Sequence, residues 1–173
     1  MGFQYEMLQE LSDYLGIEVE VKVNNDLHSN FRELADGEID LIASNLTVTE
    51  ERKDHAEFTL PHSETRQVIV QKPAPDEVLS SENESIISDP SQLSGKTVYV
   101  QKGSVHAFRL KEIKEEFDLR LTIIEVPIET EQLVKMVARG EIDYTVADEN
   151  IAYLNKKKHS DLNVQTAISN MET

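Results

Sequence analysis

The sequence predicts an α/β protein built as two similar lobes. Three observations support this class. Helical and strand-like patterns alternate along the chain, a four-residue motif recurs in both halves, and a segment of different composition separates the halves. With 173 residues the chain is long enough for one domain, or two small ones, with a buried core.

The first half opens with a helical pattern. Residues 3–15 place apolar side chains at helical spacing, and Gly16 follows as a helix stop. Residues 17–23 alternate apolar and charged side chains, which predicts a strand. The elements expected after it are a helix over 26–36, a buried strand over 39–43 and a strand over 66–71.

The second half repeats the alternation of strand and helix. Between the halves, residues 73–92 hold three prolines and many Ser, Glu and Asp residues, which predicts a linker or an exposed excursion. The expected division is therefore a partial lobe 1 over 1–72, a linker over 73–92 and lobe 2 over 93–173. The elements expected in lobe 2 are strands over 97–101, 120–126, 142–147 and 162–165, and helices over 104–117, 129–139 and 149–157.

The repeated motif sets the two halves in register. Gly37-Glu-Ile-Asp40 recurs as Gly140-Glu-Ile-Asp143 with matched flanking patterns, although any two strand–helix–strand units that end in a glycine turn look similar. The strand over 97–101 has no counterpart before the first helix, so we expect the chain to lack the first strand of lobe 1 and a C-terminal return segment. Ligands bind at the carboxyl ends of parallel strands, so two such lobes predict a clamshell around a cleft.

Composition excludes several classes of function. The net charge is −16, from 33 acidic and 17 basic residues, and such a field repels nucleic acid and anionic membranes. Cysteine is absent, which removes disulfides, thiolate metal sites and cysteine nucleophiles. No apolar run reaches the roughly 18 residues of a membrane span. The histidines lack metal-binding spacing, so we expect most of them at the surface and neither a metal nor a cofactor; they are His28, His55, His62, His106 and His159.

Polar side chains follow the strands that end each half. The stretch from Ser44 to Arg52 combines hydroxyls, a helix start capped by Thr49 and one arginine, the donors that a carboxylate ligand needs. A capped helix with a solvent-facing arginine is the alternative. In the second half, Ser104 follows a glycine and opens a helix, where backbone donors face an anion. Asp148 suits an ammonium group, or only caps the helix that starts near Glu149; both roles are compatible, since a carboxylate has spare lone pairs.

Five stretches of the chain carry recognisable motifs: Gly2–Glu6, Asp40–Arg52, Ala56–Pro61, Leu93–Ser104 and Gly140–Asp148. They resemble the motifs of bacterial extracellular solute-binding proteins of family 3, the polar amino-acid receptors of ABC importers. The resemblance implies a two-lobed, periplasmic-binding-protein-like (type II) fold. The first and last of these motifs are especially similar to membrane-bound lytic murein transglycosylase F, in which a solute-binding-like module precedes a catalytic domain.

The resemblance also implies roles for individual residues. Arg52 would bind the α-carboxylate of the ligand, and Asp148 would bind its α-ammonium group. Thr47, the region of Asn45 and Ser104 would supply further donors. The chain departs from the family pattern at two places. Val105 replaces a second hydroxyl, and His62 replaces the aromatic residue after a proline.

The function implied is non-catalytic capture of a small zwitterion, an amino acid or a muropeptide-like cell-wall fragment, by hinge closure in the periplasm or cell envelope. The implied partner is a C-terminal transglycosylase domain or an ABC permease. One alternative is an enzyme on the same fold, similar to cyclohexadienyl dehydratase. The other is an interaction module without a ligand.

Overall fold

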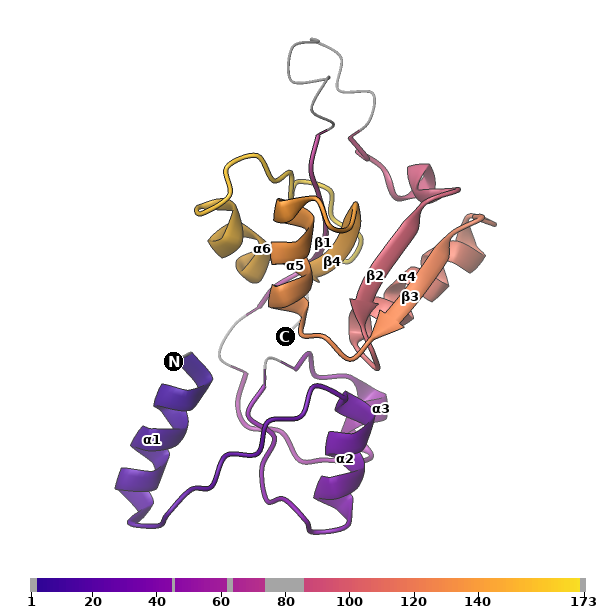
Figure 1. The fold of residues 1–173 in the computed structure, drawn as a ribbon. Coiled ribbons are helices and arrows are strands. Elements are labelled where there is room, and N and C mark those ends of the chain that lie inside the picture. Colours follow the sequence, from indigo (N-terminus) through magenta and orange to yellow (C-terminus); the bar gives the residue numbers. More distant parts are fainter. Residues whose placement is uncertain (1–2, 45, 62–63, 74–85, 172–173) are drawn as a thin grey trace. The chain divides into compact units, whose positions relative to one another are not determined.

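The computed structural model describes residues 3–44, 46–61, 64–73 and 86–171. The chain divides into two compact units, Met1–Thr59 and Leu60–Thr173, which we call unit 1 and unit 2 and describe separately. The fold of each is drawn in Figure 1.

The described residues of unit 1 form three helices, α1 (Phe3–Leu15), α2 (Leu27–Ala35) and α3 (Glu50–Lys53). The carboxylate of Asp26 begins α2 by accepting hydrogen bonds from the backbone N–H groups of His28 and Ser29. Gly37 follows α2 with φ 72°, a left-handed conformation that side chains disfavour. The helices predicted over 3–15 and 26–36 are therefore confirmed.

The strands predicted over 17–23 and 39–43 are wrong. No described residue of unit 1 lies in a strand. Their apolar side chains remain accessible: Val21 is 45% exposed, Val23 82% and Leu41 50%. An alternating pattern becomes a strand only where a neighbouring strand pairs its backbone groups, and the described residues of unit 1 provide no such neighbour.

Unit 2 is built on one mixed sheet of four strands in the order β1-β4-β2-β3. β2 runs parallel to β3 and β4, whereas β1 runs antiparallel to β4 with Gln67 opposite Asp148. The start of β1 therefore lies beside the carboxyl end of β4, at the edge of the sheet where β2 also ends. The strand bounds are Gln67–Gln71 for β1, Thr97–Gln101 for β2, Thr122–Val126 for β3 and Tyr144–Asp148 for β4.

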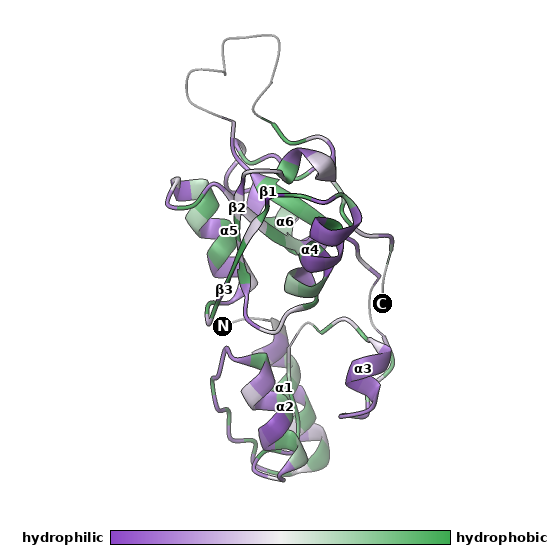
Figure 2. Cartoon of the chain, turned by 90° about the vertical axis from the view of Figure 1, so that its right-hand side faces the viewer, coloured by the Kyte–Doolittle hydropathy of each residue, from purple (hydrophilic) through white to green (hydrophobic). Residues whose placement is uncertain are grey.

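Helices cover both faces of this sheet, α4 (Val105–Glu116) on one and α5 (Thr130–Arg139) with α6 (Glu149–Lys156) on the other (Figure 1). Every residue of β1 is buried because both faces are covered. Figure 2 shows the resulting hydropathy, with hydrophobic strands and a hydrophilic outer side on α4. One core joins Ile69, Val98 and Val146 to Leu110 and Ile113, and the other joins Val68, Val70 and Ala147 to Leu133, Val137 and Ala152.

A buried glutamine links the segment that begins at residue 86 to the sheet. The side chain of Gln71 donates to the carbonyl of Ile87 at 2.7 Å and accepts from its N–H at 2.8 Å. The hydroxyl of Thr166 donates to the same carbonyl. A short 3-10 helix, η2 (Pro90–Leu93), follows and leads into β2. Part of the predicted linker, residues 74–85, lies outside the described residues.

The strand predicted over 66–71 was grouped with lobe 1, but as β1 it pairs with β4 inside unit 2. The boundary between the two compact units falls between Thr59 and Leu60. The division into lobe 1 (1–72), linker (73–92) and lobe 2 (93–173) stays a prediction. The strands and helices predicted from 97 to 157 are confirmed as β2, α4, β3, α5, β4 and α6. Residues 162–165 contribute one isolated bridge, from Asn163 to Gln71, instead of a strand.

Candidate functional site

The Arg52 guanidinium in unit 1 is held from two sides. Its Nη1 donates to the carbonyl oxygen of Thr47 at 2.9 Å, and its central carbon lies 5.7 Å from the ring centroid of Phe31 on α2. Both Arg52 and Thr47 are half-buried. The arginine is therefore not a freely solvated side chain, and contacts on both sides orient the guanidinium that extends from α3.

Local sequence explains this placement. The Thr49 hydroxyl accepts a hydrogen bond from the backbone N–H of Arg52 and so begins α3. The cap turns the chain back on itself, which brings the guanidinium to the carbonyl of Thr47. Asn45, which was predicted to donate to the ligand, lies outside the described residues.

Ser104 in unit 2 begins α4 and is buried. Its hydroxyl oxygen accepts from the N–H of Ala107 at 3.3 Å, which leaves the hydroxyl hydrogen as a donor. The neighbouring Gly103 N–H donates to the carboxylate of Glu125 at 3.1 Å. The backbone donor that the sequence suggested for an anion at this glycine is thus bound by a carboxylate of the protein itself.

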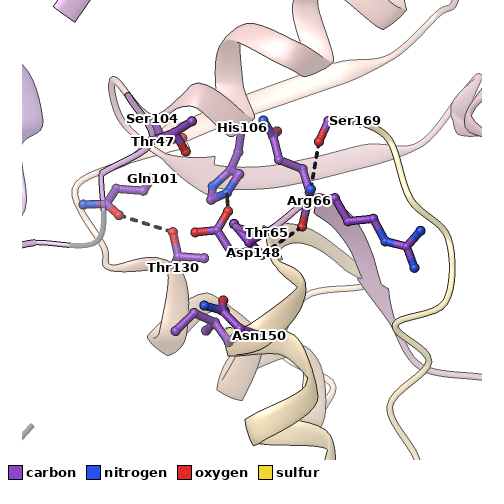
Figure 3. A network of polar contacts seen from close by, with 12 residues as sticks. Thr47, Thr65, Arg66, Gln101, Ser104, His106, Thr130, Asp148, Asn150 and Ser169 are labelled. Atoms are coloured by element: carbon purple, nitrogen blue, oxygen red, sulfur yellow. Dashed lines mark hydrogen bonds and ion pairs between the residues drawn. The ribbon is translucent and has the colours of Figure 1, made fainter. Parts of the chain in front are cut away.

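Asp148 ends β4 and precedes α6, but its side chain makes no capping hydrogen bond to that helix. The side chain is 13% exposed, and among the described residues its carboxylate contacts only the ring of His106, with Oδ1 3.2 Å from Nε2 (Figure 3). The structure therefore excludes capping as the role of Asp148. A carboxylate has spare lone pairs, so this one has capacity for a further donor.

An arginine that lies next to the end of β4 across the sheet is already neutralised. Arg66, which precedes β1, donates from Nε and Nη2 to one oxygen of Glu149 at 3.0 and 2.7 Å. This hydrogen bond raises the pKa of the Arg66 guanidinium above its ordinary value. The Glu149 N–H in turn donates to the Arg66 carbonyl at 2.8 Å. Arg66 thus anchors α6 instead of pairing with Asp148.

Two further polar residues, Thr130 and Asn150, lie near this edge, and sequence reasoning did not single them out. Thr130 at the start of α5 donates to the side chain of Gln101 at the end of β2, at 3.3 Å (Figure 3). Figure 3 also shows Asn150, on α6, close to the same edge. The sequence did offer a signal for this edge, because Gln101, the partner of Thr130, is the last residue of a predicted strand.

His106 is the important omission, because the histidines were expected mostly at the surface. It lies on α4 and is 5% exposed. The signal was its spacing: His106, Leu110 and Ile113 follow one another at helical intervals, and all three are buried. A histidine on an apolar helical face is buried with the rest of that face.

Two features are absent from the described parts of the chain. No group of three or more histidine, aspartate or glutamate side chains there is placed to hold a metal ion. Among those same residues, no helix combines the length and apolar character needed to cross a bilayer.

Solved structures of binding proteins share this fold. An ancestral arginine-binding protein bound to arginine matches 96% of the chain with a TM-score of 0.76 and 25% identity, and the match covers 69% of that protein. The arginine-bound form of truncated ArgBP from T. maritima matches 99% of the chain, with a TM-score of 0.77 and 25% identity, over 74% of its own length. The fold is thus the mixed α/β, type II fold of periplasmic amino-acid-binding proteins.

Curated relatives from several bacteria share the name membrane-bound lytic murein transglycosylase F. The membrane-bound lytic murein transglycosylase F of Desulfosudis oleivorans is 32% identical over 95% of the chain, and that of Pseudomonas putida is 33% identical over 90%. These matches cover 34% and 30% of the relatives. The chain therefore spans about a third of the length of the curated relatives that it matches.

One family model matches more than half of the chain. The model describes bacterial extracellular solute-binding proteins, family 3, and it matches residues 1–109. This stretch includes α3 with Arg52 and the start of α4 at Ser104. Together with the solved structures of the same fold, this match shows that the chain belongs to the bacterial extracellular solute-binding proteins, family 3.

Proposed function

We propose that the chain is a non-catalytic module that binds a small zwitterionic solute, an amino acid or a peptide-like cell-wall fragment. One observation carries this proposal. Asp148 is a nearly buried carboxylate at the carboxyl end of β4 that neither caps α6 nor pairs with a lysine or arginine among the described residues. Such a carboxylate is well suited to bind an ammonium group.

The other end of the ligand is assigned to unit 1. A guanidinium binds a carboxylate with two parallel hydrogen bonds, and Arg52 is already oriented by Thr47 and Phe31. Thr47 and Asn45 would supply neutral donors, and the Ser104 hydroxyl would add one from unit 2. The ligand would then lie in the interlobe cleft that the sequence predicts, with closure favoured because it contacts both lobes.

The proposal includes a place for the module in a longer protein. The relatives named membrane-bound lytic murein transglycosylase F are about three times as long as the match. We propose that the chain is the sensor module of a transglycosylase F-like protein in the periplasm or cell envelope. A receptor that delivers amino acids to an ABC permease is the second candidate, supported by the arginine-bound structures of the same fold.

Isothermal titration calorimetry of the full chain against the standard L-amino acids and purified muropeptides tests the ligand class. At least one zwitterion is expected to bind. Its N-acetyl derivative and its methyl ester, which lack the ammonium and the carboxylate respectively, are expected to bind much more weakly. No heat with any compound would overturn the proposal and favour the ligand-free interaction module.

Two matched pairs of variants test the assigned residues. Asp148→Asn and Arg52→Gln are each expected to weaken binding by about 30-fold or more, because each leaves a buried ligand charge unpaired. Asp143→Asn and Arg32→Gln remove the same charges at exposed positions and are expected to bind normally. Equal affinity of Asp148→Asn and Asp143→Asn would refute the role of Asp148.

Mass spectrometry of the bound compound after incubation tests the absence of catalysis. The compound is expected to be recovered unchanged. Turnover that disappears in Asp148→Asn would establish the enzyme alternative instead.

A further inference from the structure

The His106–Asp148 pair contains a buried titratable group that the proposed function has not used. The His106 side chain is 6% exposed, and its Nε2 lies 3.2 Å from Oδ1 of Asp148. The two residues come from different elements, the first turn of α4 and the end of β4 (Figure 3). The contact therefore depends on the packing of α4 against the sheet.

Hydrogen-bonding capacity fixes which ring nitrogen carries the hydrogen. An ionised carboxylate only accepts, so the hydrogen of this bond belongs to Nε2. The other ring nitrogen, Nδ1, is buried and has no hydrogen-bond partner among the described residues. A charged ring would add a hydrogen at Nδ1, where the described residues offer no acceptor.

The hydrogen bond from His106 leaves one half of the Asp148 carboxylate available. His106 binds Oδ1, and no described residue contacts Oδ2 through a hydrogen bond or ion pair. A neutral N–H donor orients the carboxylate without cancelling its charge, so the attraction for an ammonium group is kept.

The charges around the ring allow this arrangement. Asp148 faces it from β4, and the nearest opposite charges at that edge, Arg66 and Glu149, are bonded to each other. On α4 itself, Arg109 donates to the carbonyl of Ile168 and to Glu112. Among the described residues, His106 is thus the side chain positioned to change the charge beside Asp148.

We propose that His106 is a positioning residue that orients Asp148 for the ammonium group of the ligand, and that protonation of His106 releases the ligand. This inference rests on the proposed function. An imidazolium beside Asp148 would compete with the ammonium group for the same carboxylate and repel it, so binding and protonation of the ring would oppose each other.

The first test needs no ligand. Long-range ¹H–¹⁵N NMR of the full chain near neutral pH reports which nitrogen of each histidine carries the hydrogen. The Nε2–H form is expected for His106. An Nδ1–H form, or an unchanged His106 spectrum in Asp148→Asn, would overturn the inference.

The second test measures affinity against pH with the standard L-amino acids as probes. Between about pH 8 and about pH 5 the affinity of the wild-type chain is expected to fall by about 5- to 150-fold. His106→Gln keeps an N–H donor but does not titrate, so it is expected to bind like the wild-type chain at pH 8 and to lose the pH dependence. His106→Phe removes the donor and is expected to bind about tenfold more weakly at pH 8.

His28→Gln is the matched control, because His28 is also the second residue of its helix but is exposed. It is expected to keep the wild-type pH profile. Thermal unfolding of each variant separates lost binding from lost folding. Binding that is equally strong at both pH values, or unaffected in His106→Phe, overturns this inference and leaves the proposed function standing. No binding by the wild-type chain at any pH overturns both.

Discussion

Unit 1 and unit 2 carry similar sequence patterns but bury their apolar side chains to very different extents. In unit 2 the strands pair, and apolar side chains from both sheet faces join two cores. In the described part of unit 1, the one buried apolar residue is Leu27, which is still 6% exposed. Both turn motifs nevertheless adopt the same backbone conformation, with φ 72° at Gly37 and 74° at Gly140. Local conformation follows the local sequence, whereas burial requires a partner strand.

Hydrogen exchange is expected to show the largest contrast between the units. Amides of β1 and β4 lie in a sheet covered on both faces, so they are expected to open only with global unfolding. Amides of residues 17–23 have no ladder and are expected to exchange at least about 1,000-fold faster. Similar protection in both segments, measured by mass spectrometry, would show that unit 1 is as well packed as unit 2.

Truncating one leucine in each unit gives the next largest effect. Leu133 in unit 2 is 1% exposed, and its replacement by alanine leaves a cavity. Leu133→Ala is therefore expected to lower the free energy of unfolding by about 2–5 kcal/mol. Leu11, 39% exposed on α1, is expected to cost less than about 0.5 kcal/mol. Urea denaturation of Leu133→Ala and Leu11→Ala measures both. Equal losses would contradict the contrast in burial.

Two glutamines, one buried in unit 2 and one on α1 in unit 1, extend the comparison of stability to polar side chains. Gln71→Leu removes both hydrogen bonds to Ile87 in a buried site and is expected to cost about 1–3 kcal/mol. Gln9→Leu removes an exposed bond to Tyr5 on α1 and is expected to change stability by less than about 0.5 kcal/mol. The measurement is the denaturation midpoint. A neutral Gln71→Leu would mean that Ile87 finds other partners.

Two lysine–carboxylate pairs, one in each unit, give the smallest effect. Hydrogen bonds from Lys72 and Lys22 lower the pKa values of Asp161 and Glu33 respectively. Lowered values mean that each pair contributes stability above the ordinary carboxyl pKa and loses it as pH falls through the lowered pKa.

Carboxyl NMR titration of two lysine variants compares these pairs. Lys72→Met is expected to return the pKa of Asp161 towards its ordinary value, because that lysine is the largest cause of the shift. Lys22→Met is expected to raise the pKa of Glu33 only in part, because Ser29 and Asn24 also donate to it. A full return of Glu33 in Lys22→Met would show that those two donors contribute nothing.

The elements of unit 2 could be predicted from sequence because each is defined by its own residues. Thr97–Gln101 alternates, and Ser104 caps the helix that follows. The partners of those elements could not be predicted. β1 was grouped with the first half because it precedes the linker, yet it pairs with β4, and a pairing over such a sequence distance leaves no local pattern.

The candidate site was predicted in the same uneven way. Arg52, Ser104 and Asp148 were singled out because they follow predicted strand ends, where ligand-binding side chains gather. Ser104 and Asp148 do lie at the ends of β2 and β4, but the strand predicted before Arg52 is not formed, and the binding role of all three stays a prediction. His106 was missed because it belongs to the buried face of a helix, and its contact with Asp148 depends on where that helix lies on the sheet.

The reversed direction of β1 has a mechanical consequence. β1 begins at the rim of the sheet that carries Asp148, not at the opposite rim. Arg66, which directly precedes β1, is bonded to Glu149 through both its carbonyl and its guanidinium. A displacement of Arg66 therefore acts directly on the residue next to Asp148.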